Sequence, residues 1–312
     1  MGFRRPPPPE ASIGGGKLGT VTVAAREEKG ETPVFAEDWA GAEQRLRQAL
    51  RAGGPVLIAY SGGVDSAYLA WVAHQELGSG MLALIADSAS LARSQYEQAL
   101  AFANHHGFAC ETIRTGEVEW AEYARNGADR CFFCKDELFR QMERELDRRP
   151  RFRSLAYGAN RDDQFDYRPG AEAARRHRVR APLLEAGLGK AAVRELARQA
   201  GLEVWDRPAS PCLASRVMHG IAITPAVLGR IEAGEEALRR MGFRQFRARD
   251  HGDLIRIEIA REEMPRALNL QSAGALTAVF KGLGFRYVTL DLEGFRSGSL
   301  NPPVTPPSAA PR

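Results

Sequence analysis

Two groups of residues in this sequence have the types and spacing that chemistry requires. The first is the run Ser61-Gly62-Gly63-Val64-Asp65-Ser66. Its glycines let a backbone approach an anion, its hydroxyls add hydrogen-bond donors, and Asp65 offers an oxygen ligand for Mg²⁺. The second group is three cysteines, Cys131, Cys134 and, 78 positions later, Cys212. Thiols so placed are typical of metal sites and of sulfur or redox chemistry.

The glycine-containing run stands between an apolar segment, 55–60, and a helical pattern over 64–77. A strand, a glycine loop and a helix in this order leave backbone N–H groups unpaired at a helix N-terminus, where the dipole favours phosphate. The lysine and spacing of a Walker loop are absent, so transfer of a γ-phosphoryl group is not indicated. The alternative is an ordinary βα turn, but both serines and Asp65 stand where a phosphate cradle would use them.

The three cysteines leave several kinds of site open. Three thiolates suit a [4Fe-4S] cluster with one open iron. Cys131 and Cys134 alone could form a redox dithiol, and Cys212 alone could act as a nucleophile. Since Lys135 and Arg130 flank a predicted helix N-terminus, we expect lowered pKa values for Cys131 and Cys134.

A structural zinc site is the remaining alternative for the thiols. Zinc prefers four ligands, so Cys110, His105 or His106 would have to complete the set. Cys110 stands in a strand pattern and is interpreted as a small buried hydrophobic residue.

Alternating strand and helix patterns position both groups. The predicted class is α/β, with a parallel sheet covered on both faces. Strands are predicted over 55–60, 81–86, 108–113, 155–157 and 202–205, and helices over 35–53, 64–77, 94–105, 120–125, 133–146 and 190–200. A smaller α+β domain follows, with a helix over 225–241, strands over 244–248, 253–259 and 286–292, and helices between 263 and 283.

Within the second domain, isoleucines at 255, 257 and 259 alternate with Arg256 and Glu258, which predicts a sheet with one wet face. The domain assignment is a disordered tail over 1–32, the parallel-sheet domain over 33–208, the smaller domain over 209–300 and a loose tail over 301–312. We expect truncation before residue 33 to leave activity intact.

Composition excludes several protein classes. The chain has 312 residues, 44% of them hydrophobic and 26% charged, which fits neither a disulfide-rich miniprotein, a disordered chain nor a coiled coil. Its apolar stretches are far shorter than the ~20 residues of a membrane span, and a signal peptide is missing, so we expect a cytoplasmic protein. The net charge of +4 favours anionic partners, either nucleotides or RNA.

The run at 61–66 resembles the pyrophosphate-binding loop of the PP-loop ATP pyrophosphatases, which cleave ATP between its α and β phosphates and adenylylate a substrate oxygen. Longer strings narrow the resemblance: GANRDDQFDYRPG at 158–170, RPASPCLASR at 207–216 and DLEGFRSG at 291–298. Together they resemble the LarE family, ATP-dependent sulfur transferases of nickel-pincer nucleotide cofactor synthesis. The resemblance covers about residues 35–300.

This resemblance implies a substrate, pyridinium-3,5-dicarboxylate mononucleotide, whose carboxylates are adenylylated and converted to thiocarboxylates. AMP serves to make a carboxylate oxygen a leaving group. Asp65 is the expected Mg²⁺ ligand, and Asp87 and Ser88 follow the second strand, where nucleotide sites of parallel sheets lie. The full set expected to bind ATP is Ser61, Gly62, Gly63, Asp65, Ser66, Asp87, Ser88, Gly158, Asp163 and Arg168.

For the sulfur source the resemblance implies two routes. Family members with only the cysteine matching Cys212 sacrifice its sulfur and end with dehydroalanine, whereas members with all three are thought to hold a [4Fe-4S] cluster. Because Cys131 and Cys134 are present, we favour the cluster and a reusable enzyme, with Arg216 as a fixed cation for the phosphorylated substrate. Relatives also imply a homo-oligomer, such as a hexamer, and a sulfide donor protein is a further expected partner.

Other polar residues of these strings carry weaker hypotheses. Asp162, Asp163, Asp166 and Arg168 either contact Mg²⁺, ATP or substrate phosphate, or form a capping and salt-bridging loop. Lys190 and Arg194 either reach a phosphate or face solvent. Arg249, Asp253, Glu258 and Asp291 are assigned to a substrate-phosphate site or an oligomer contact.

Two other functions stay open. A tRNA thiolation enzyme would use similar chemistry, but no concentrated basic tract with interleaved aromatics is present, so nucleic acid is disfavoured as a partner. A non-catalytic adenine-nucleotide module with a structural metal is the other alternative. Substrate-dependent pyrophosphate release distinguishes it from an enzyme.

Overall fold

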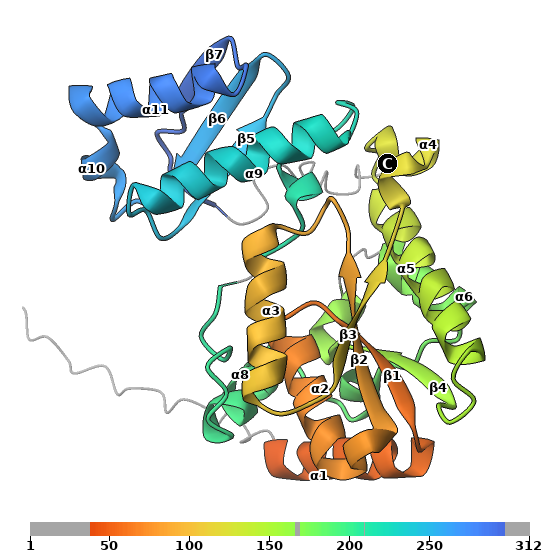
Figure 1. The fold of residues 1–312 in the computed structure, drawn as a ribbon. Helices are drawn as coiled ribbons and strands as arrows, with labels where there is room; N and C mark the ends of the chain where they lie inside the picture. Colours follow the sequence, from red (N-terminus) through yellow and green to blue (C-terminus); the bar gives the residue numbers. More distant parts are fainter. Residues whose placement is uncertain (1–37, 166–168, 209, 297–312) are drawn as a thin grey trace, which may run out of the picture. The chain divides into compact units, whose positions relative to one another are not determined.

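The computed structural model describes residues 38–165, 169–208 and 210–296. Its larger sheet has four parallel strands in the order β3-β2-β1-β4 (Figure 1), which confirms the predicted parallel α/β arrangement. The strands are β1 (Val56–Tyr60), β2 (Met81–Asp87), β3 (Cys110–Arg114) and β4 (Ser154–Tyr157). Pairing is in register, with Val56 opposite both Met81 and Ser154.

The two central strands are buried on both faces because their side chains alternate between two apolar layers. Residues 56, 58 and 60 of β1 lie in one layer with helices α1 (Trp39–Gly53), α2 (Val64–Leu77), α3 (Arg93–His105), α7 (Pro182–Glu185) and α8 (Lys190–Gln199). Residues 57 and 59 lie in the other layer with α5 (Arg130–Asp147) and α6 (Pro169–Arg176). Charged chemistry is therefore left to the ends of these strands.

The smaller sheet has the order β5-β6-β7, with an antiparallel pair followed by a parallel one. Its strands are β5 (Phe246–Asp250), β6 (Leu254–Ile259) and β7 (Tyr287–Leu290). Its helices are α9 (Pro225–Arg240), α10 (Met264–Ala267) and α11 (Leu270–Gly282). One face carries the apolar core, which contains Ile255, Ile257 and Phe280.

Two expectations about the strands are wrong. The segment 202–205 lies in turns, and the N–H of Leu202 donates to Ala197 O at 2.9 Å. The prediction failed because Leu202 and Val204, two buried apolar residues two positions apart, fit a turn packed on α8 as well as a strand. The second sheet has no wet face at Glu258, whose side chain is fully buried against arginines. Alternation alone does not show whether a charged position meets water or a counter-ion.

Two helices were not expected from the sequence, α6 and α7, and the short helix α4 (Ala121–Ala124) lies within the predicted 120–125 segment. Both expected tails, 1–32 and 301–312, lie outside the described residues. Among the described helices, none is both long and apolar enough to cross a membrane.

Candidate active site

The loop after β1 is shaped by close packing around its glycines. Gly62 has a φ of 73°, and a Cβ there would stand 2.6 Å from the Cβ of Ala99 on α3. Ser66 Oγ donates to Gly63 O at 3.1 Å and accepts from Ser61 N at 3.2 Å. No side chain caps α2 at Gly63, so the first amides of this helix face the loop without a side-chain acceptor. This is the geometry of an anion site.

Gly158, at the carboxyl end of β4, touches the same helix start. A Cβ at Gly158 would lie 2.8 Å from Ser66 N and 3.0 Å from Asp65 C, closer than side chains pack. In the sequence analysis Gly158 is assigned to a nucleotide site only because of the family resemblance. In the structure it lies against Asp65 and Ser66 of the glycine loop. Only glycine lets β4 end so close to α2.

Asp65 is the residue of this loop whose carboxylate is least satisfied by its surroundings. Its Oδ1 is buried and has no hydrogen-bond partner. Burial raises the pKa of Asp65, and the neighbouring Asp163 raises it further, against the opposing charge of Lys190. An orphaned carboxylate oxygen beside a second carboxylate is the donor set that Mg²⁺ prefers, so these residues fit the ion.

The acidic residues Asp162 and Asp163 have different contacts: one caps a helix and the other lies near Asp65. Asp162 Oδ2 accepts from Lys190 N at 2.8 Å at the start of α8, which matches the capping alternative. Asp163 Oδ2 accepts from Asn160 N at 3.1 Å and remains near Asp65. Asp166 and Arg168 lie outside the described residues. Arg194 donates to Trp205 O and to Arg207 O, so it holds the chain after α8 rather than facing solvent.

At the end of β2, Asp87 and Ser88 are tied into local contacts. Asp87 Oδ1 lies 2.7 Å from Arg93 Nη1, and buried Ser88 hydrogen-bonds the carboxylate of buried Glu117. Ser90, two residues further on, hydrogen-bonds the hydroxyl of Tyr123. These contacts extend from the carboxyl edge of the sheet towards the cysteines.

Cys134 and Cys212 come together although 78 positions separate them in the chain. Both are half-buried against one apolar cluster, whose fully buried members include Tyr123, Leu213 and Ile231. Burial raises the pKa of Tyr123, and the charges of Cys212 and Cys134 raise it further, so both thiols neighbour its hydroxyl. Cys131 is exposed, in the first turn of α5.

The expected lowering of the cysteine pKa values is wrong for Cys134. Burial raises the pKa of its thiol, and the charges of Glu117 and Cys212 add to this, outweighing the opposite effect of Lys135. Arg130 does not face the thiols, because its guanidinium donates to Asn126 Oδ1 and to Ala214 O.

Asn126 is a functional candidate that the sequence interpretation missed. Fully buried, its Nδ2 donates to three carbonyls after Cys212, those of Val217, Met218 and Ile221. Its φ of 58° is a left-handed conformation, and the dipeptide Asn126-Gly127 was the available signal for such a turn. With Leu213 N donating to Ser90 O at 2.8 Å, these bonds anchor the Cys212 segment.

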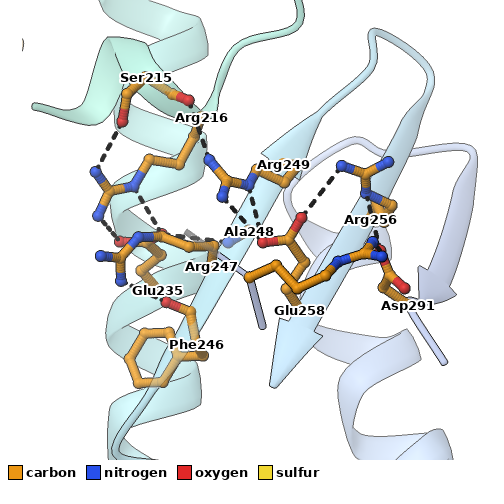
Figure 2. A network of polar contacts seen from close by, with 11 residues as sticks. Ser215, Arg216, Glu235, Phe246, Arg247, Ala248, Arg249, Arg256, Glu258 and Asp291 are labelled. Carbon is orange, nitrogen blue, oxygen red and sulfur yellow. Dashed lines mark hydrogen bonds and ion pairs between the residues drawn. The ribbon is translucent and has the colours of Figure 1, made fainter. Parts of the chain in front are cut away.

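Arg216 is 3% exposed and uses its guanidinium within the protein. It donates to both oxygens of Glu235, at 3.0 and 3.1 Å, and to the carbonyls of Pro211 and Cys212 (Figure 2 shows the contacts with Glu235 and Ser215). The expected cation near Cys212 is therefore present, but its hydrogen bonds are with the protein, so it positions the cysteine segment.

The alternative zinc ligands lie elsewhere. Ser90, which bonds the Cys212 segment, precedes the N-terminus of α3, whereas His105 and His106 lie at its other end. The 13 residues of α3 span roughly 20 Å. Cys110 starts β3, packs against the core and has its pKa raised to about 12 by burial, as expected of a structural thiol.

The second sheet presents arginines on the face opposite its core (Figure 2). Arg249 donates to Glu258 Oε2 at 2.9 Å, and Arg256 reaches Glu258 Oε1 at 3.1 Å and Asp291 at 3.6 Å. Burial, together with Arg216 and Arg249, lowers the pKa of Arg247 to about 10. In this group five arginines (216, 247, 249, 256, 296) meet four carboxylates (235, 258, 291, 293), which leaves one excess positive charge.

Asp253 does not join this group. Its side chain is exposed and its backbone carbonyl accepts from Arg286 and Tyr287. We call the five arginines and four carboxylates the arginine face.

Similarity to known proteins extends over most of the chain. It is 41% identical over 267 residues to an uncharacterized protein of Synechocystis sp., covering 84% of this chain and 97% of the relative. It is 30% identical over 251 residues to the pyridinium-3,5-bisthiocarboxylic acid mononucleotide synthase of Lactiplantibacillus plantarum, covering 80% and 90%. An uncharacterized protein of Methanocaldococcus jannaschii is 26% identical, over 78% of this chain and 91% of its own length. No protein-family model matches the chain.

Proposed function

Since the chain belongs to the LarE family of pyridinium-3,5-bisthiocarboxylic acid mononucleotide synthases, we propose that it is an ATP-dependent sulfur transferase. Its proposed substrate is pyridinium-3,5-dicarboxylate mononucleotide, and its product is the bisthiocarboxylate. One observation carries the proposal: the bond from Leu213 N to Ser90 O puts Cys212 beside the end of β2, the strand next to the glycine loop of β1. A phosphate site and a sulfur site at one edge of a sheet suit acyl activation followed by sulfur transfer.

In the first step a substrate carboxylate oxygen attacks the α-phosphorus of ATP. The bond from that phosphorus to the bridging oxygen breaks, and pyrophosphate leaves with the electron pair. The first amides of α2 and the hydroxyls of Ser61 and Ser66 would bind this pyrophosphate as its charge grows. Asp65 and Asp163 would hold Mg²⁺, which supplies charge neutralisation at the phosphates.

In the second step a sulfur nucleophile attacks the acyl carbon, and AMP leaves. Cys131, Cys134 and Cys212 would hold a [4Fe-4S] cluster, which supplies a sulfide equivalent. Cys134 and Cys212 are half-buried beside an apolar cluster, and Cys131 is exposed one turn away from Cys134 on α5. Cluster cysteines bind different irons, so their sulfurs need not touch. Asn126, Arg130 and Arg216 keep the Cys212 backbone in place.

The arginine face is the proposed site for the phosphate of the mononucleotide. Its arginines outnumber its carboxylates and several of them are partly buried, so these guanidinium groups are poorly hydrated and repel one another, as the lowered pKa of Arg247 indicates. A phosphate dianion would neutralise that excess and accept bidentate bonds from guanidinium groups. The acidic partners Glu258 and Asp291 hold the arginines at fixed positions until it arrives.

Pyrophosphate release with ATP, Mg²⁺ and the pyridinium dicarboxylate tests the activity. We expect release that depends on the dicarboxylate and a product of higher mass by one sulfur-for-oxygen exchange per carboxylate. ATP binding without release would instead support the nucleotide-binding module, and tRNA-dependent release would support a tRNA thiolase.

The sulfur source is tested after anaerobic purification. Iron and sulfide analysis with intact-mass measurement after turnover distinguishes the two routes. The cluster route gives bound iron and an unchanged protein mass. The sacrificial route gives a loss of about 34 Da, one H₂S, as Cys212 becomes dehydroalanine. Cys110→Ser is the matched control, because this thiol lies away from the site and should affect neither result.

A further inference from the structure

His105, His106 and Glu203 form a cluster that the proposed reaction does not use. Among the residues that the structure describes, this is the one set of three in which imidazole, thiol or carboxylate ligand atoms all lie within 4.8 Å of one another. His106 Nε2 and Glu203 Oε2 are 2.9 Å apart, and the rings of His105 and His106 meet edge to face at 4.8 Å between centroids. Two imidazoles and a carboxylate therefore converge on one point.

The surroundings favour a cation at that point. His105 is the last residue of α3 and His106 follows it, so both rings lie at the helix C-terminus, where the dipole is negative. His106 also packs on Phe102, with ring centroids 4.3 Å apart, which limits the positions of its imidazole. The hydrogen bond with His106 lowers the pKa of Glu203 despite its partial burial, as expected of a carboxylate beside imidazoles.

We propose that His105, His106 and Glu203 bind a divalent transition-metal ion, with Zn²⁺ as the best match. Two neutral imidazoles and one carboxylate are a common ligand set for zinc, and a water molecule completes four-coordination at a solvent-exposed site. The oxygen-rich preference of Mg²⁺ and Ca²⁺ disfavours those ions. The site is separate from the cysteines, because α3 holds the two apart.

A bound ion would add a link between the end of α3 and the turns after α8, two segments that also share an apolar cluster through Phe102 and Val204. Glu203 lies in the turns after α8, where Arg194 already holds the carbonyls of Trp205 and Arg207. Fixing Glu203 to the end of α3 would stabilise the start of the segment that leads to Cys212. The ion therefore acts on structure, and we expect no direct part in sulfur transfer.

The test uses the full chain without a histidine tag and with Cys131, Cys134 and Cys212 replaced by serine, so that thiols do not bind the probe. Isothermal titration with Zn²⁺ alone should give one equivalent, and the unfolding temperature should rise. Loss of an outer-shell partner already weakens metal binding by about 10–100-fold, so His105→Ala and Glu203→Gln should each weaken Zn²⁺ by more than tenfold. His219→Ala removes an exposed imidazole outside the cluster and should change nothing.

Co²⁺ provides a second readout in the same serine variant, in which the three thiols cannot bind the ion. Cobalt bound by imidazole and carboxylate gives visible d–d absorption without the near-ultraviolet charge-transfer band of thiolate ligation. The d–d component should disappear in His105→Ala and remain in His219→Ala. If Zn²⁺ binds the serine variant equally well with and without His105, or does not bind it, the proposed site is wrong.

Discussion

Two carboxylates have opposite surroundings: half-buried Asp65, in the first turn of α2 after the β1 loop, and fully buried Glu258, near the end of β6. Asp65 has an oxygen with no partner and a second carboxylate nearby, and its pKa is raised. Glu258 is fully buried between Arg249 and Arg256. Strand β1 is apolar on both faces, so charged residues can only follow its end. The smaller sheet has its apolar core on one face, so charged residues can be buried on the other.

The contrast shows how this molecule separates function from stability. Lys190 only partly compensates Asp65, whose Oδ1 has no hydrogen-bond partner, and this suits a residue that meets an ion. Glu258 compensates arginines that would otherwise repel one another, so it stabilises the fold whether or not a ligand is bound. The following variants test this division.

Glu258→Ala should have the largest effect. Removing one partner of a buried ion pair leaves uncompensated charge, which costs about 3–5 kcal/mol of unfolding free energy. Urea denaturation measures it. Glu236→Ala, at a half-exposed pair with Arg239, should cost less than about 1 kcal/mol. If the two variants lose equal stability, the arginine face is not held together by Glu258.

Asp65→Asn should lower pyrophosphate release by at least about 100-fold, because a ligand of the metal is lost. Its stability should rise at neutral pH. Since the folded pKa is raised, ionised Asp65 destabilises the fold once the pH exceeds the folded pKa, and the gain from asparagine should vanish below the ordinary pKa of aspartate. Thermal unfolding from pH 3 to pH 8 tests this. A variant that is less stable at pH 7 would show that Asp65 is paired.

Arg216→Lys keeps the charge but loses the paired bonds to Glu235 and the carbonyl contacts. Hydrogen bonds to charged groups are worth about 1.5–3 kcal/mol, which is the expected stability loss. Pyrophosphate release should persist while thiocarboxylate formation falls. Equal loss of both activities would indicate that Arg216 touches the substrate.

Thr224→Ala should have the smallest effect, about 1 kcal/mol of unfolding free energy. Thr224 Oγ1 accepts from Val227 N at 3.2 Å and caps α9, the helix that carries Glu235. Thr224→Ser keeps the cap and should match the parent. This pair of variants calibrates how much one neutral bond contributes near the arginine face.

The sequence predicts the parallel sheet well, because buried runs such as 55–60 and 81–86 have few alternatives beside a glycine loop. It predicts α2 to the residue, from Val64 to Leu77, since Gly63 and Gly78 end the pattern on both sides. The strand expected over 202–205 fails because a period of two over four residues also fits consecutive turns.

For the candidate site, local chemistry is predictable and long-range pairing is not. Gly158 lies against Asp65 and Ser66 of the loop, and the role of these residues in binding ATP stays a prediction. Nothing local indicates that Arg216 pairs with Glu235, that Arg249 pairs with Glu258, or that Asn126 holds the chain after Cys212. Those contacts depend on which segments the fold brings together, and the type of a charged residue does not identify its partner.

The bond between Leu213 and Ser90 has a consequence for biogenesis. During synthesis the glycine loop, β2 and the first two cysteines leave the ribosome long before Cys212 does. Cys134 is therefore synthesised 78 residues before Cys212. Until Cys212 follows, the apolar cluster around Cys134 is incomplete and its thiol is accessible to oxidants and to metal ions. Assembly of the proposed three-thiol site is therefore a late event in the synthesis of the chain.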